Sequence, residues 1–153
     1  TPSAIALSRQ KLPYINPKFS ENNECEKGAY TVRMDAHENK VTLVASGSEV
    51  ELAINVHYEL KKNNISSKVV SMPCQELFNK QSEDFKKNIL DKESLIVTIE
   101  AGNVSSWEKY LGNRGISIGI DKFGESAPYK QVYEHLNLSV EKIVLAIQER
   151  LRK

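Results

Sequence analysis

Alternation of strand-like and helix-like segments is the feature that most constrains the fold of this chain. After Gly28, short apolar runs rich in β-branched residues recur between longer segments whose apolar residues are spaced three and four positions apart. Because strands separated by helices pair mostly in parallel, this order predicts a three-layer α/β/α fold. The predicted strands cover 29–34, 41–45, 68–72, 95–99 and 116–120, and the predicted helices cover 48–62, 82–90, 105–110, 128–136 and 139–151.

The first two predicted strands are separated only by a turn at Glu38-Asn39-Lys40. Such a short connection predicts that the first strand runs antiparallel to its neighbour in the chain. We therefore expect a mixed, mostly parallel sheet of about five strands. Ser48 with Glu51, and Ser105 with Glu108, have the spacing of a capping box, in which each side chain bonds an orphan amide of a helix start.

The first 27 residues differ in character from the rest. Ala4-Ile5-Ala6-Leu7 is a short apolar run typical of a buried strand, and 13–27 lacks periodicity and is rich in asparagine and charge. We assign 1–13 to the end of a preceding domain, 14–27 to a linker and 28–153 to the main domain. The chain begins with Thr1, so we expect a piece of a longer protein, a processed product or an engineered segment.

Composition narrows the possible partners and the compartment. The formal net charge of +1 argues against a broad nucleic-acid-binding face. No apolar run approaches the roughly 18 residues that span a bilayer, so we expect no membrane segment. Cys25 and Cys74 match no disulfide framework or zinc pattern, which favours a reducing, cytoplasmic location.

The residues that could carry chemistry each have a simpler structural interpretation. His37, His57 and His135 have no metal-ligand spacing, and we expect structural or surface roles for them. Ser46-Gly47-Ser48 follows a predicted parallel strand and could hold an anion at a helix N-terminus, and Glu100-Ala101-Gly102 follows another such strand. The favoured alternative is that Ser48 caps its helix and Glu100 makes a local loop contact.

Two further candidates lie outside these loops. Asp121 and Glu125 could pair as acid and base, although the run from Asp121 to Pro128 is more typical of a turn. Arg9 follows the first apolar run, and its planar guanidinium is suited to grip a phosphate. On the residues alone, a surface role for Arg9 is favoured.

Taken together, these segments resemble the C-terminal part of transketolase, preceded by the last strand of the pyrimidine-binding domain. The resemblance covers essentially the whole chain in family order, and the Phe-Gly-Glu-Ser-Ala-Pro run is its most specific part. The matching segments are 8–10 with 12–13, 28–30, 44–50, 69–73, 99–102, Trp107 with 109–110, and 123–128.

The resemblance implies a role in a larger enzyme. Transketolases transfer a two-carbon ketol unit from a ketose phosphate to an aldose phosphate in the pentose phosphate pathway. They act as homodimers with thiamine diphosphate and a divalent cation, magnesium or calcium. The Gly-Asp-Gly segment that holds the metal in the family is absent here. We therefore expect no catalytic, cofactor-binding or metal-binding residue in this chain.

The family's arginine of the Ser-Arg-Gln segment binds the substrate phosphate, and here that residue is Arg9. The chain alone is then expected to be inactive, and to serve structure and dimer formation. Two alternatives stay open: a stand-alone ligand-binding or regulatory module, and one chain of a split transketolase.

Overall fold

The computed structural model describes residues 8, 10–15, 23–36 and 38–153. Arg9, His37 and the predicted strand at 4–7 lie outside these residues. The elements in chain order are η1 (Glu24–Lys27), β1 (Tyr30–Met34), β2 (Val41–Ala45), α1 (Glu49–Lys62), β3 (Ser67–Ser71), α2 (Gln75–Asn79), α3 (Glu83–Ile89), β4 (Leu95–Ile99), η2 (Glu108–Tyr110), β5 (Ile116–Ile118), α4 (Tyr129–His135) and α5 (Val140–Leu151).

The five strands form one mixed sheet in the order β1-β3-β2-β4-β5. The pairs β2–β3, β2–β4 and β4–β5 are parallel, and β1 pairs antiparallel with β3. The predicted fold class and strand number are therefore confirmed. β1 does run opposite to β2, as predicted, but β3 lies between them. The short turn reverses the chain without making a hairpin of hydrogen-bonded neighbours.

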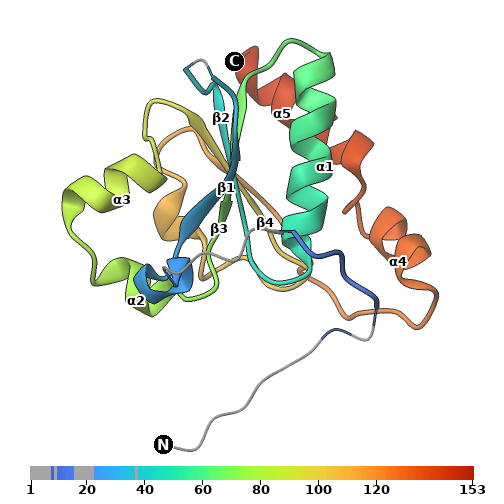
Figure 1. Ribbon diagram of the computed structural model, residues 1–153. Coiled ribbons are helices and arrows are strands. Elements are labelled where there is room, and N and C mark those ends of the chain that lie inside the picture. Colours follow the sequence, from blue (N-terminus) through green and yellow to red (C-terminus); the bar gives the residue numbers. More distant parts are fainter. Residues whose placement is uncertain (1–7, 9, 16–22, 37) are drawn as a thin grey trace, which may run out of the picture.

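Helices cover both faces of the sheet (Figure 1). α1 and α5 lie against one face, and α2 and α3 lie on the other. Alternate residues of the central strands supply both cores: Leu43 and Val97 pack toward α1 and α5, whereas Val44 and Ile96 pack toward Phe78 of α2. Burial of both sheet faces explains why the central strands β2 and β4 are nearly continuous apolar runs.

Serine side chains cap the starts of two helices, α3 and α5. Ser139 accepts a hydrogen bond from the amide of Lys142 and so caps α5. The two predicted capping boxes were wrong. Ser48 occupies the N-cap position of α1 without a side-chain cap bond, and Ser105 Oγ donates to Asn103 Oδ1. In both places a nearby carbonyl or carboxylate oxygen competes for the serine hydroxyl.

The segment 10–15, which overlaps the start of the predicted linker, lies beside the domain. Arg33 Nη2 donates to the carbonyl oxygen of Ile15 at 3.2 Å, and Ile15 packs against the core cluster under α1. This part of the chain is therefore held to the domain by a polar contact and an apolar contact. In the part of the chain described, no helix is long and apolar enough to cross a membrane.

Candidate functional site

The topology points to one edge of the sheet as the place where a ligand site would form. The chain leaves β2 toward β3 through α1, and it leaves β4 toward β5 through η2 on the other face. The connections therefore diverge between β2 and β4, which end together with Ala45 opposite Ile99. Open α/β sheets bind ligands at such a switch point, outside the carboxyl ends of the strands.

Glu49 is the most deeply buried acidic residue at this edge. It is the first residue of α1, and only 5% of its surface is exposed. Its Oε1 accepts hydrogen bonds from Ser48 Oγ at 2.7 Å and from the Tyr133 hydroxyl at 2.6 Å. The partial positive charge of the helix N-terminus also favours a carboxylate here. The protein's own side chain thus supplies the anion that the Ser46-Gly47-Ser48 loop was considered to bind.

Glu100 follows β4 beside this buried carboxylate. It is half-buried, and Trp107 Nε1 donates to its Oε2 at 3.1 Å. Burial raises the pKa of the Glu100 carboxyl, and the negative charge of Glu49 raises it further. The predicted local loop contact of Glu100 is present. Two neighbouring carboxyls make this edge unfavourable for a free phosphate or diphosphate.

Tyr133 connects α4 to the start of α1. Burial, followed by the adjacent Glu49 carboxylate, raises the pKa of the Tyr133 phenol well above its usual range. The hydroxyl therefore stays protonated and remains a donor to Glu49 at physiological pH. This bond joins residues 84 positions apart in the sequence. It fixes α4 against the switch point.

The described histidines have partners that fit structural or surface roles. His57 is buried on α1, with its Nδ1 at 2.8 Å from Ser67 Oγ and 3.9 Å from Asp35 Oδ2. Burial lowers the pKa of His57, although Asp35 opposes that effect. His135 lies at the surface, 3.1 Å from Glu125 Oε1. Glu125 therefore pairs with this histidine, and the run 121–128 is exposed as expected for a turn.

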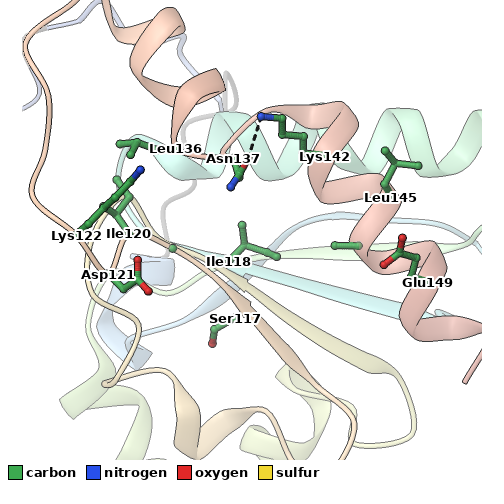
Figure 2. A pocket seen from close by; sticks show the side chains of 12 residues that line it. Ser117, Ile118, Ile120, Asp121, Lys122, Leu136, Asn137, Lys142, Leu145 and Glu149 are labelled. Carbon is green, nitrogen blue, oxygen red and sulfur yellow. Dashed lines mark hydrogen bonds between the residues drawn. The ribbon is translucent and has the colours of Figure 1, made fainter.

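A hollow between β5 and α5 is another candidate for a functional site (Figure 2). Figure 2 shows Ile118 and Ile120 on one side of it and Leu145 and Glu149 on the other. The Lys142 ammonium has partners within the chain, because its Nζ donates to Asn137 Oδ1 at 2.9 Å and to the carbonyl oxygen of Glu134. This hollow brings no convergent set of polar groups toward a common point, so the switch point is the better candidate.

No metal centre forms within residues 8, 10–15, 23–36 and 38–153, where no group of three or more His, Cys, Asp or Glu side chains could hold an ion. The acidic switch point also does not fit the diphosphate of the cofactor that the sequence resemblance implies.

Sequence reasoning missed Glu49 and Tyr133. Glu49 carried a weak signal as the first residue of a helix after a strand, whereas nothing local marks Tyr133.

Comparison with known proteins gives a consistent result. Residues 28–139 match the family model described as the transketolase-like TK C-terminal domain. The chain is 40% identical to chloroplastic transketolase of Solanum tuberosum over 152 residues, which are 97% of this chain and 20% of that protein. It thus spans about a fifth of that relative's length.

Solved structures agree with this match. A transketolase from Campylobacter jejuni superposes with a TM-score of 0.76 at 35% identity, over 86% of this chain and 20% of that one. A mutant transketolase from Pichia stipitis superposes with a TM-score of 0.84 at 28% identity, over 94% of this chain and 20% of that one. Other Pichia stipitis transketolase structures are complexes with xylulose 5-phosphate and sedoheptulose 7-phosphate.

Proposed function

The chain belongs to the transketolase family, where it matches the C-terminal domain, and on that premise we propose that it works as one part of a longer ketol-transferring enzyme. The observation that carries this proposal is the match of nearly the whole chain to only about a fifth of a transketolase. The full enzyme would transfer a two-carbon unit between sugar phosphates in the pentose phosphate pathway. It would act as a homodimer.

The proposed contribution of residues 28–153 is structural. Thiamine diphosphate, when bound to the full enzyme, supplies the carbon nucleophile and electron sink. We assign that cofactor and its magnesium or calcium ion to other parts of the protein. The acidic edge formed by Glu49 and Glu100 supports this assignment, because it disfavours a diphosphate. The boundaries at 13, 14–27 and 28 stay our proposal for the preceding domain, the linker and this domain.

Arg9 is the one residue here to which we assign a contact with substrate. It stands in the Ser8-Arg9-Gln10 segment that resembles the family's phosphate-binding arginine. The relatives solved with sugar phosphates support a phosphate ligand for the full enzyme. A guanidinium bonds phosphate oxygens in a bidentate fork, which suits this task. We also propose a cytoplasmic location, supported by two cysteines that form no disulfide.

The experiment is to replace Arg9 by Ala in the full-length enzyme and measure steady-state kinetics. Loss of a charge-assisted hydrogen bond costs roughly 1.5–3 kcal/mol, so kcat/KM for a ketose phosphate should fall about 10- to 150-fold. Arg9→Lys should recover part of the loss, because it keeps the charge without the fork. An unchanged kcat/KM for the Ala variant would refute the phosphate assignment.

A further inference from the structure

A separate hollow lies at the start of β4, on the sheet face that α2 and α3 cover. Its volume is about 650 Å³, which is within the usual size range of small-molecule sites. Its walls come from α2, α3, residues 90–96 and residues 109–114. The switch point lies at the other end of β4, roughly 13 Å away along the strand. This basic hollow, named for the charges on its rim, is therefore distinct from the acidic edge described above.

The rim of the basic hollow has more positive than negative charge. Its basic side chains are Lys86, Lys92, Lys109 and Arg114, and its acidic side chains are Glu83 and Glu93. Lys86 pairs with Glu83 at 2.5 Å, and the pKa of the Glu83 carboxyl is lowered chiefly by Lys86 and further by Lys92. Among the described residues, neither Lys92 nor Arg114 forms an ion pair. These two cations are therefore available to a bound anion.

The floor of the basic hollow is apolar. Phe78, Leu90 and Ile96 line it and are 1%, 7% and 3% exposed. The Tyr110 ring packs edge-on to that of Phe78, with ring centroids 5.8 Å apart. An apolar group that enters the hollow removes its own surface and the remaining floor surface from water. The hollow therefore suits a ligand that is apolar at one end and anionic at the other.

Hydrogen bonds and close packing hold the walls of the basic hollow in place. The Tyr110 hydroxyl donates to Asn79 Oδ1 at 2.9 Å, which joins η2 to α2. Arg150 Nε donates to the carbonyl oxygen of Arg114 at 2.7 Å. Gly115 packs so closely against backbone carbonyl oxygens that an added Cβ would overlap them. Because these walls are already formed, a ligand loses little affinity to ordering of the protein.

We propose that the basic hollow binds a phosphate ester that carries a planar ring, with a nucleotide as the simplest example. Arg114 would bond two phosphate oxygens through its planar guanidinium, and Lys92 would add a second positive charge. The ring would lie on the apolar floor. Such a site adds a ligand to a domain whose proposed contribution is structural. The argument depends on this hollow alone and not on the family assignment.

The test is a titration of the full chain of 153 residues with adenosine 5′-monophosphate (AMP), measured by calorimetry and by amide shifts in NMR. Inorganic phosphate and adenosine are titrated separately, because they supply the anion and the ring alone. AMP should bind at least about tenfold more tightly than either, since only AMP engages both rim and floor. The amide shifts should cluster in 90–96 and 109–115. Added salt should weaken binding, because the rim charges are exposed.

Variants of the two available cations locate the site. Arg114→Ala and Lys92→Ala should each raise the Kd for AMP about fivefold, and Arg114→Lys should recover part of the loss because it keeps the charge without the fork. Lys130→Ala is the matched control, since Lys130 is an exposed lysine of α4 outside the hollow, and it should leave the Kd unchanged. All three side chains are exposed, so the fold should tolerate each substitution.

Absence of AMP binding would overturn the proposal, as would amide shifts centred elsewhere in the domain. Equal affinities for AMP and inorganic phosphate would show that the floor takes no part. Equal losses in Arg114→Ala and Lys130→Ala would reduce the binding to general attraction by surface charge. Both of these results refute the site. None of the outcomes involves ketol transfer, so the proposed function is tested separately by Arg9→Ala.

Discussion

Replacement of Gly28 by Ala should be among the most damaging single-methyl changes in this domain. Gly28 has a φ of +82°, a left-handed conformation that costs an L-residue with a side chain roughly 1–2 kcal/mol. Its amide donates to the Cys25 carbonyl at 2.9 Å and its carbonyl accepts from the Cys74 amide at 3.2 Å. The residue therefore joins η1 to the start of α2 through its backbone alone.

A methyl group at this position would overlap backbone atoms. The added Cβ would meet the Cys74 carbonyl oxygen and the Phe78 amide nitrogen. Neither can rotate away, because both belong to the backbone around α2. Forcing them apart adds an overpacking cost of about 1–3 kcal/mol to the conformational cost. We therefore expect Gly28→Ala to lower the free energy of unfolding by about 2–5 kcal/mol.

Two other glycines separate these contributions. Gly47 has a φ of +52° but no atom within 4 Å of an added Cβ, so Gly47→Ala should cost only about 1 kcal/mol. Gly124 has neither a positive φ nor a near neighbour, and Gly124→Ala should be within about 0.5 kcal/mol of the wild type. Urea unfolding followed by circular dichroism measures all three. Equal losses for the Ala variants of Gly28 and Gly47 would refute the close-packing argument.

Three further predictions concern titration and ligand binding. Burial lowers the pKa of His57, so the unfolded chain binds more protons than the folded chain between that lowered value and about 6.5. The free energy of unfolding should therefore fall as the pH falls through this window. The urea midpoint of His57→Asn should lack this pH dependence, whereas that of the control His135→Asn should keep it. The Trp107 indole lowers the pKa of Glu100 by its hydrogen bond, so Trp107→Phe should raise that pKa further in carboxyl NMR titrations, and an unchanged value would contradict the contact. Thiamine diphosphate with magnesium should leave the Tm of this chain unchanged in thermal scans, since a ligand stabilises only a fold that binds it; a clear rise would oppose our assignment of the cofactor to other parts of the protein.

Much of the fold follows from local sequence because burial and periodicity act within a few residues. Leu95–Ile99 is a run of apolar and β-branched residues buried on both faces, and its predicted bounds match β4. The helix α2 was missed, because a five-residue helix with one buried residue, Phe78, shows no periodicity. The pairing of β1 with β3 was also missed, since strand order depends on the whole sheet.

The candidate site was less accessible to sequence analysis. The loops after β2 and β4 could be selected as candidates from the strand order alone, and the structure does bring the ends of these two strands together. The charge at this edge was not foreseen. It depends on Tyr133 reaching Glu49 across 84 positions, a contact that the packing of α4 creates and that no local pattern encodes.

The size of the native polypeptide that contains these residues tests the central claim most directly. Antibodies against 28–153 would capture the protein from source cells, and mass spectrometry would measure the intact mass and the peptides present. The account predicts one chain several times heavier than 17.3 kDa, with transketolase sequence ahead of Thr1. A native chain near 17.3 kDa would contradict it, and would favour a split enzyme or a free-standing module.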